Sequence, residues 1–581
     1  MIDYRNRIEL LRQQMQSEGI DAYIIDNTDP HQNEYMPEHW KCIEWLTGFR
    51  GEVATVIVTT TAAWLWTDSR FFISGAEQLQ GTSVQLMKLC IDPDPATWLA
   101  SLQQTSAQTS SAPLHTAGVK SLLPRELAQA TATDIDLINR LWEDRPSLPL
   151  APIELYPEQY AGEGARSKMA RILSQCDTLL LYRLDEIAWV LNLRGSDIPC
   201  TPVFVSYLLL SHNGCTLYVD RAKLSPAVEE YLSGISVKVA PYDEAPTSML
   251  CDEMERLNPI PVFKAIKNET EIQGIRAAMH RDGIVMTEFY YWLEQRLGLI
   301  EPDASAPALP STPVTEMECV QRLIDLRSQK PLYREESFPA IVAWNAHGAM
   351  PHYENCAATD VPIQGNGLLL IDTGGQYLDG TTDITRTIGI GHISDAMRHD
   401  YTLVLKGHIR LAEAVCPAGT RGDQLDALAR MDLWRDGKTY LHGTSHGVGH
   451  YLSVHEGPQS VRMQHNPQPL LPGMVMSNEP AIYLEGRYGI RHENCVLVRP
   501  YNVSDQAPLA TPCQPNEFGD YICLETLTLC YLDTHCLDLK LLTRGEIDWI
   551  NNYNQWVYSS LAPELPEKMR NWLMTKCQPI G

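Results

Sequence analysis

The fold is decided by residues 367–387, which read Gly367-Leu-Leu-Leu-Ile-Asp372-Thr-Gly-Gly-Gln-Tyr-Leu-Asp379-Gly380-Thr-Thr-Asp383-Ile-Thr-Arg-Thr387. This stretch predicts two strands joined by a two-residue turn at Asp379-Gly380, because Asp-Gly is a preferred hairpin turn. That turn pairs Asp372 with Thr387 and places Asp383 on the same face of the second strand as Thr387. A bulge in the hairpin would instead bring the two carboxylates directly opposite each other.

Both acids therefore project from one face of an otherwise apolar hairpin. Asp372 ends the apolar run Leu368–Ile371, where an unpaired buried carboxylate would be very costly. A solvated sheet face is the ordinary explanation for two such acids, but a cation held between them would remove the cost.

A second cluster follows at residues 441–458, which read Leu-His442-Gly-Thr-Ser-His446-Gly-Val-Gly-His450-Tyr-Leu-Ser-Val-His455-Glu-Gly-Pro. Four histidines within fourteen residues are a high concentration for a chain that has 17 in all. The intervening glycines allow tight turns and the close approach of a ligand. Any one of these histidines alone would be interpreted as an exposed loop residue, and His450 keeps that interpretation. Together the histidines indicate a binding site.

Two glutamates complete the candidate site. A hairpin centred on Gly486 pairs Glu479 with Glu493 across two strands. One histidine and four carboxylates make a hard, oxygen-rich site. Such a site suits a pair of Mn²⁺, Co²⁺ or Zn²⁺ ions roughly 3.5–4 Å apart, bridged by an activated water.

The 581 residues exceed what one hydrophobic core usually organises. Proline-rich segments at 144–152 and 258–261 interrupt regular structure and predict boundaries. We therefore expect an α/β (α+β) protein of three domains, 1–147, 148–262 and 263–581, with a C-terminal extension from about 513. The first two share an order of helix and strand that suggests an internal duplication, and Asn268 is a candidate N-cap for the first helix of the third.

The amino-acid composition limits the binding partners and the location that we expect for the protein. The 72 acidic and 46 basic residues give a net charge of −26, which disfavours nucleic acid and anionic membranes as partners. No apolar run approaches the ~20 residues that span a bilayer, and the first residues have no signal-peptide core. The 15 cysteines contain no CxxC pair and are expected to be reduced and mostly buried. These features predict a cytoplasmic protein.

The order Asp, Asp, His, Glu, Glu resembles the ligand pattern of the pita-bread metallopeptidases. His-Gly-x-x-His-Gly-Val-Gly from His442 and Val-His-Glu-Gly-Pro around His455 are similar to the Xaa-Pro aminopeptidase family, in its three-domain cytosolic aminopeptidase P form. The resemblance extends along the chain through four further motifs, at 66–72, 184–189, 192–197 and 547–553.

This resemblance implies two N-terminal domains of the creatinase N-terminal type and a pita-bread catalytic domain. It implies five metal ligands: Asp372, Asp383, His446, Glu479 and Glu493. Among them, Asp383 and Glu493 would bridge both ions, and Glu479 would also act as the general base. It also implies three catalytic histidines: His352, His442 and His455. Ser445 and His492 depart from the family pattern, and His492 could either shift a pKa or merely fill space.

The implied activity is metal-dependent release of the N-terminal residue from peptides with proline in second position, by attack of a metal-bridging hydroxide on the Xaa-Pro bond. The expected cofactors are two divalent ions, Mn²⁺ in the first place and Co²⁺ or Zn²⁺ as alternatives. A homodimer is expected. A prolidase restricted to Xaa-Pro dipeptides and a non-catalytic pita-bread binding protein are the alternatives.

Overall fold

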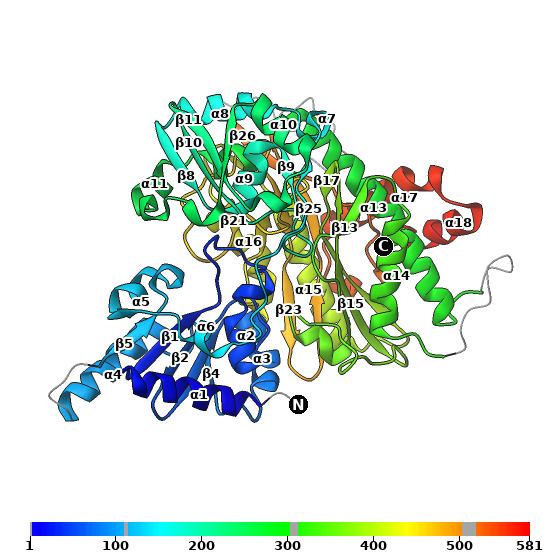
Figure 1. The fold of residues 1–581 in the computed structure, drawn as a ribbon. Coiled ribbons are helices and arrows are strands. Elements are labelled where there is room, and N and C mark those ends of the chain that lie inside the picture. Colours follow the sequence, from blue (N-terminus) through cyan, green and yellow to red (C-terminus); the bar gives the residue numbers. More distant parts are fainter. Residues whose placement is uncertain (1–2, 110–113, 302–311, 502–518) are drawn as a thin grey trace.

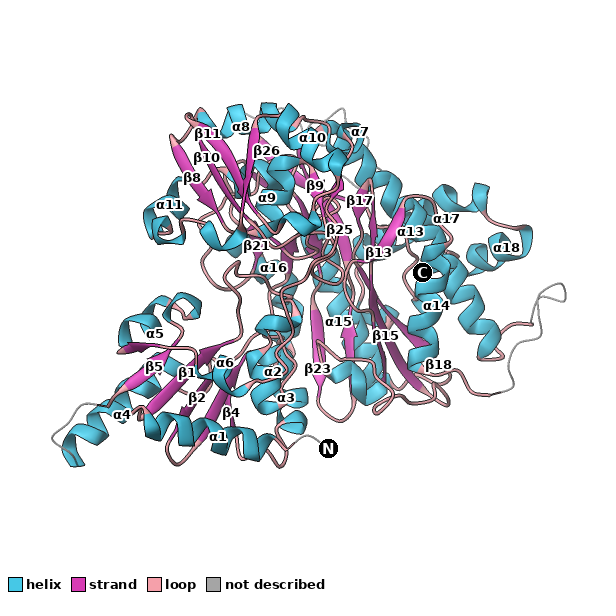
Figure 2. Ribbon diagram, in the orientation of Figure 1, coloured by secondary structure: helices cyan, strands magenta, loops and turns pink. Residues whose placement is uncertain are grey.

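The computed structural model describes residues 3–109, 114–301, 312–501 and 519–581. In this structure the chain forms three successive units, coloured blue, cyan to green, and green to red in Figure 1. The predicted α/β (α+β) fold class is confirmed, because all three units combine helices with sheets (Figure 2). The predicted start of the C-terminal extension near residue 513 lies outside the described residues.

The first unit is a six-stranded mixed sheet in the order β4-β3-β2-β1-β5-β6, flanked by helices. Alternate residues of β1 and β2 contribute to its main core, including Tyr23, Ile25, Val56 and Val58. Its strands are β1 (Ala22–Asp26), β2 (Thr55–Thr59), β3 (Ala63–Thr67), β4 (Gln85–Lys88), β5 (Thr116–Gly118) and β6 (Thr133–Asp134), and its helices are α1 (Tyr4–Ser17), α2 (Cys42–Thr47), α3 (Phe72–Gln78), α4 (Pro95–Thr109), α5 (Arg125–Ala130) and α6 (Leu137–Leu141).

The second unit has a four-stranded sheet in the order β12-β11-β10-β8. Its apolar helix α9 lies in the core of the unit, with six of its eight residues in one hydrophobic cluster. The strands are β8 (Thr178–Leu181), β10 (Tyr207–Ser211), β11 (Gly214–Tyr218) and β12 (Val237–Ala240), beside the short pair β7 (Glu154–Leu155) and β9 (Leu193–Arg194). The helices are α7 (Glu158–Ala161), α8 (Ala165–Leu173), α9 (Leu184–Leu191), α10 (Pro226–Gly234), α11 (Asp252–Leu257) and α12 (Ile260–Ala265).

The third unit carries the candidate site on a three-stranded sheet, β14-β15-β18, and a six-stranded sheet, β19-β26-β25-β22-β20-β21. Its strands are β13 (Tyr333–Glu336), β14 (Ile341–Trp344), β15 (Gly367–Thr373), β16 (Gly375–Tyr377), β17 (Gly380–Thr381), β18 (Ile384–Ile390), β19 (Val415–Pro417), β20 (Ser445–Gly447), β21 (Glu456–Val461), β22 (Val475–Asn478), β23 (Ala481–Leu484), β24 (Tyr488–Arg491), β25 (Asn494–Pro500) and β26 (Tyr521–Thr526). Its helices are α13 (Glu269–Arg296), α14 (Glu316–Ser328), α15 (Asp395–Ala412), α16 (Asp426–Arg435), α17 (Arg544–Leu561) and α18 (Glu567–Lys576).

Helix α13 begins as the sequence predicts. The Asn268 side chain accepts a hydrogen bond from the Glu271 backbone, and the Glu271 side chain accepts one from the Asn268 backbone. This capping box satisfies two helix donors that would otherwise be unpaired. The main core of the unit then packs α13, α14, α15 and α17 against β14, β15 and β18.

The predicted register of the first hairpin is wrong. Asp372 pairs with Thr385 rather than Thr387, because the turn consists of Leu378 and Asp379 and begins one residue earlier than Asp379-Gly380. Moving a turn by one residue shifts every pair by two, so the side chains keep their faces. Gly380 instead lies in β17, where a Cβ atom would come within 3.0 Å of the Ile275 backbone. The helix α13 therefore requires glycine at this position.

The predicted register of the second hairpin is confirmed. Strands β23 and β24 pair Ala481 with Arg491, and β22 and β25 continue the same register with Asn478 opposite Asn494. Glu479 and Glu493 lie in the short breaks between these two paired regions. The hairpin therefore brings the two glutamates opposite each other.

Two further expectations concern the whole chain. Within the described ranges, no helix has both the length and the apolar character needed to cross a bilayer. The 14 cysteines of the same ranges are all free, and nine of them are buried. The expectation of reduced, mostly buried thiols holds for these residues.

Candidate metal centre

Three of the five predicted ligands meet in one place. Asp383 immediately precedes β18, His446 lies in β20, and Glu493 immediately precedes β25. One ligand atom from each lies within 4.8 Å of the other two. Strands of the β14-β15-β18 sheet and of the six-stranded sheet therefore converge on a single cluster of possible metal ligands.

Glu479 joins this cluster through the histidine. His446 Nε2 lies 3.3 Å from Glu479 Oε1 and 3.4 Å from Asp383 Oδ2. His446 Nδ1 lies 2.9 Å from the Gly447 carbonyl oxygen, and the Ser477 hydroxyl donates to Glu479 Oε1 at 3.0 Å. A carbonyl at Nδ1 assigns the ring proton to that nitrogen and leaves Nε2 as the ligand atom.

Asp372 lies at the edge of the cluster, paired with Arg491. The Arg491 guanidinium donates to Asp372 Oδ2, to the Tyr483 hydroxyl at 2.6 Å and to the Thr385 hydroxyl at 3.0 Å. The other carboxylate oxygen, Asp372 Oδ1, is buried and has no hydrogen-bond partner. A buried carboxylate oxygen without a partner is costly, and a cation beside it would satisfy it.

The electrostatics of the cluster also favour a bound cation. Burial raises the pKa of Glu493 well above its usual range, and the charges of Asp383 and Glu479 raise it further. Burial likewise raises the pKa values of Asp372 and Glu479. Burial alone would lower the pKa of His446, but Asp383 and Glu479 outweigh it and raise it to about 9. Divalent cations would relieve this repulsion, and one imidazole with four carboxylates is a donor set that suits them.

The three predicted catalytic histidines surround this cluster. The His455 ring contacts the His446 ring edge-on, with 4.4 Å between centroids. His442 Nε2 lies 2.9 Å from the Tyr483 hydroxyl, and its Nδ1 lies 2.7 Å from the Gly443 carbonyl oxygen. Burial lowers the pKa of His442 well below its usual range, so this ring is neutral.

Sequence reasoning missed the residues that the first unit contributes. Glu34 Oε2 lies 2.6 Å from His455 Nδ1, and Glu52 Oε2 lies 3.3 Å from His352 Nδ1. Arg70 donates to Glu34 at 3.2 Å and also pairs with Asp68. The motif at 66–72 contains Arg70, but neither glutamate belongs to a recognisable pattern.

Glu34 remains ionised in this arrangement. Burial would raise the pKa of Glu34, but the adjacent His455 and Arg70 outweigh burial and hold it well below its usual range. A permanently ionised carboxylate at Nδ1 fixes the orientation of the His455 ring.

The structure also shows the surroundings of two further histidines, His450 and His492. The interpretation of His450 as an exposed loop residue is wrong, because it is 2% exposed and its Nδ1 lies 3.3 Å from the Tyr156 hydroxyl. His492 is fully buried with its ring edge-on to Tyr401, and neither ring nitrogen has a hydrogen-bond partner. Burial lowers the pKa of His492 well below its usual range, so of the two predicted alternatives it fills space.

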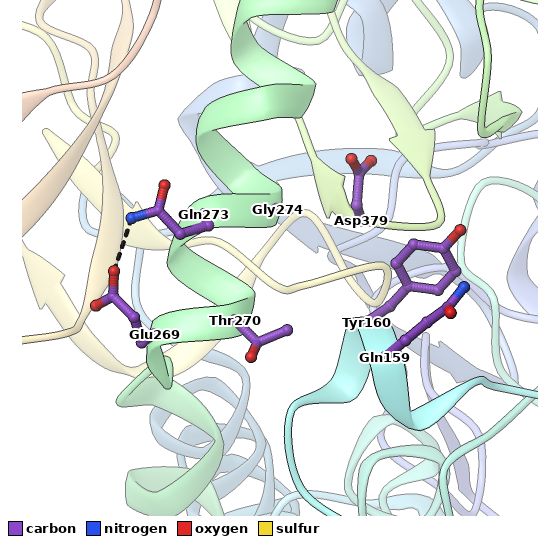
Figure 3. Close-up of a pocket in the computed structure, with 7 residues that line it drawn as sticks. All are labelled: Gln159, Tyr160, Glu269, Thr270, Gln273, Gly274 and Asp379. Atoms are coloured by element: carbon purple, nitrogen blue, oxygen red, sulfur yellow. Dashed lines mark hydrogen bonds between the residues drawn. The ribbon is translucent and has the colours of Figure 1, made fainter.

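A separate pocket of about 460 Å³ lies at the start of α13. Figure 3 shows its lining: Gln159, Tyr160, Glu269, Thr270, Gln273, Gly274 and Asp379. Gln273 donates to Glu269 one turn earlier on α13 at 2.7 Å. None of the predicted ligands or catalytic histidines lines this pocket, so it is not the candidate metal centre.

Family comparisons define the class of protein. Residues 273–500 match the model of metallopeptidase family M24, and residues 520–580 match that of the C-terminal region of this peptidase. Residues 7–137 and 144–251 each match a creatinase/prolidase N-terminal domain. The chain is thus built as an M24 metallopeptidase with two creatinase-type N-terminal domains and a pita-bread domain, which confirms the predicted fold.

Full-length relatives narrow the class. The chain is 33% identical to a protein named probable Xaa-Pro aminopeptidase P from Aspergillus niger, covering 100% of this chain and 99% of the relative. It is 32% identical to aminopeptidase P2 of Arabidopsis thaliana, covering 97% and 86%. The chain belongs to the Xaa-Pro aminopeptidase P family of M24 metallopeptidases, as the sequence motifs predict.

A solved structure agrees along the whole chain. The X-prolyl aminopeptidase of Caenorhabditis elegans, described as a cytosolic enzyme with a di-nuclear active site, superposes with a TM-score of 0.88 at 29% identity and covers 100% of both chains.

Proposed function

We propose that this protein is a metal-dependent aminopeptidase that releases the N-terminal residue from peptides with proline in second position. The observation that carries the proposal is the convergence of Asp383, His446 and Glu493 within 4.8 Å in a chain with full-length similarity to Xaa-Pro aminopeptidases. A Xaa-Pro bond has no N–H group, which removes a donor that general peptidases use.

The proposed cofactors are two divalent ions, Mn²⁺ in the first place. Asp372, Asp383, His446, Glu479 and Glu493 would hold them, with Asp383 and Glu493 shared between the two. The unpartnered Asp372 Oδ1 and the raised pKa values of the buried carboxyls support this assignment. When bound, such ions supply Lewis acidity and lower the pKa of water.

The protein's own groups would then handle protons and developing charge. Glu479, whose pKa is raised by burial and whose Oε1 accepts a hydrogen bond from the Ser477 hydroxyl, is suited to accept a proton. His352 and His455 each face a first-unit carboxylate through Nδ1, which leaves Nε2 as the nitrogen that can bind the peptide. His442, held by Tyr483, would complete the substrate side.

The first unit is proposed to form one wall of the peptide site. Beyond the two glutamates, its Phe71 ring packs edge-on against His352 with 5.3 Å between centroids. A wall this close to the metal ligands leaves little room for residues upstream of the cleaved bond. This arrangement supports removal of a single N-terminal residue.

A peptide panel tests the activity. We expect added Mn²⁺ to support cleavage of Xaa-Pro dipeptides and of longer Xaa-Pro peptides, and little cleavage of Xaa-Ala controls. Cleavage confined to dipeptides would establish the prolidase alternative. If the protein, reconstituted with Mn²⁺, bound metal but cleaved none of the peptides, the proposed activity would be wrong and a binding role would remain.

We also propose a homodimer in the cytoplasm. Trp434 is 46% exposed and Leu441 is 51% exposed, and both large apolar side chains lie on the segment that leads into the histidine cluster. Exposed tryptophan is typical of interfaces. The cytosolic description of the Caenorhabditis elegans enzyme supports the location. Sedimentation of Trp434→Gln tests the dimer: a monomeric variant is expected, and a wild-type monomer would exclude it.

We further propose three domains with the limits 1–147, 148–262 and 263–581. The end of the first N-terminal match at 137 and the start of the second at 144 support a boundary close to the start of the proline-rich segment.

A further inference from the structure

Five buried polar residues meet beside Glu479 and Glu493, and we refer to them as the polar layer: Arg386 of β18, His408 of α15, Asn478 of β22, Asn494 of β25 and Tyr553 of α17. Each is at most 1% exposed. Asn478 precedes Glu479, Asn494 follows Glu493, and the two asparagines are register partners. The polar layer therefore adjoins both glutamates through the backbone.

His408 joins the two asparagines. Its Nδ1 donates to the Asn478 carbonyl oxygen at 3.0 Å, and its Nε2 accepts from Asn494 Nδ2 at 3.0 Å. The Asn478 side chain returns a bond to the His408 carbonyl oxygen at 2.9 Å. Burial lowers the pKa of His408 to about 3, so the ring is neutral and keeps one tautomer. The spacing of the two strands is fixed at this point.

Arg386 joins the polar layer to Glu493. Its guanidinium donates to the Glu493 carbonyl oxygen at 2.6 Å, to Asn494 Oδ1 at 2.8 Å and to the Tyr553 hydroxyl at 2.8 Å. Its remaining contacts are to three backbone carbonyl oxygens, and the described part of the chain contains no ion pair of Arg386 with a carboxylate. A buried guanidinium with only neutral acceptors depends on every one of them.

Tyr553 brings the C-terminal region into this network. Besides accepting from Arg386, its hydroxyl lies 2.9 Å from the Thr528 carbonyl oxygen and can donate to it. Its ring stacks on Trp549, with 5.3 Å between centroids and 3° between planes. Helix α17 is itself fixed, because Glu546 in its first turn accepts from the buried Lys406 of α15 at 2.7 Å. Tyr553 is thus held rigidly at the end of the chain farthest in sequence from the first unit.

We propose that helix α17 supports the metal centre, and that Tyr553 is a positioning residue which acts through Arg386 and Asn494 to hold Glu493 and Glu479 in place for metal binding. The inference rests on the proposed function, because it takes the two glutamates as metal ligands. It gives the Ile547–Tyr553 motif a role that similarity alone does not provide. Partners of metal ligands typically change metal affinity by roughly 10–100-fold when they are removed.

The test is the affinity of the metal-stripped full-length protein for Mn²⁺, measured by isothermal titration calorimetry. Tyr553→Phe removes one oxygen and keeps the stacked ring. Tyr558→Phe is the matched control, because it removes the same atom from a partly buried position on the same helix. We expect Tyr553→Phe to weaken Mn²⁺ binding at least tenfold and Tyr558→Phe to change it less than twofold. Activity of Tyr553→Phe should return toward the wild-type value at saturating Mn²⁺.

Thermal unfolding of the metal-free variants separates positioning from stability. We expect Tyr553→Phe without metal to melt within a few degrees of the wild type. Wild-type Mn²⁺ affinity in Tyr553→Phe would overturn the inference, and so would weaker binding accompanied by a large fall in metal-free melting temperature. If the wild type itself bound no Mn²⁺, the proposed metal centre would fail first, so the two failures are distinguishable.

Discussion

Removing the metal should reverse the way in which stability depends on pH. In the metal-free protein the pKa of His446 is raised from 6.5 to about 9, chiefly because Asp383 and Glu479 outweigh burial. A group with a raised folded-state pKa contributes stability that is fully present below its unfolded pKa and is lost as the pH rises through its folded pKa. Stability from His446 should therefore be complete below pH 6.5 and lost by about pH 9.

The size of the effect follows from the pKa. Each tenfold change in proton affinity is worth about 1.4 kcal/mol, so His446 alone contributes about 3 kcal/mol. The raised pKa values of Asp372, Glu479 and Glu493 have the same sign, so their stability is also lost as the pH rises. Bound metal requires a neutral imidazole and ionised carboxylates, so its own contribution grows with pH. The two forms should have slopes of opposite sign.

Differential scanning calorimetry at pH 6.5 and pH 9, with chelator and with saturating Mn²⁺, measures both slopes. For a domain of roughly 300 residues, such as the third unit, ~3 kcal/mol corresponds to a shift in melting temperature of about 4–5 °C. His446→Gln should flatten the metal-free slope, whereas His465→Gln, whose ring is exposed and lies 3.2 Å from Asp423, should not. Identical metal-free slopes in the wild type and His446→Gln would refute the reasoning.

Four other substitutions have defined outcomes. Asp383→Asn should lose metal and activity together, whereas His352→Gln should keep the metal and lose roughly 10²–10³-fold in kcat. Elemental analysis measures the metal content of both variants. Equal metal loss in the two would show that His352 is a ligand. Glu34→Gln weakens the charged hydrogen bond to His455 (2.6 Å), and the ~1.5–3 kcal/mol of such a bond predicts a fall of about 10–100-fold in kcat/KM at unchanged metal content. Unchanged kinetics would show that the first unit does not position this ring. Lys264→Met removes the buried cation that lies between the half-buried carboxylate of Asp185 and the buried carboxylate of Glu456. It should destabilise the protein by about 3–5 kcal/mol in urea titrations. A change under ~1 kcal/mol would contradict this.

The four carboxylates of the proposed metal centre could be placed on two hairpins from the sequence, because hairpin geometry is local. Their role as ligands, and that of His446, came from the family resemblance. The turn at Gly486 fixes the register of Glu479 and Glu493 within a few residues. The turn of the first hairpin could not be predicted in the same way. Asp-Gly has a strong turn preference, but helix α13 occupies the space next to Gly380. Packing against a distant helix decides the turn there, and no local pattern contains that information.

The residues that the sequence did not reveal all act across long separations. The bond from His455 to Glu34 spans 421 positions, and that from Arg386 to Tyr553 spans 167. Both partners are ordinary residue types, and only the fold brings them to the site. The predicted exposure of His450 was wrong for the same reason, because the tyrosine that contacts it comes from the second unit.

Through these long-range contacts the two ends of the chain have different roles at the site. The proposed metal ligands are all in the third unit, and the polar layer links two of them to Tyr553 of helix α17. Two imidazoles on the substrate side, those of His352 and His455, are instead held by carboxylates of the first unit. Because the two sets of contacts share no residue, metal affinity and turnover should respond to different substitutions. Independent responses of this kind are expected when groups have no common partner. In the proposed arrangement the metal centre is assembled within the third unit, whereas the peptide site lies between the first and third units.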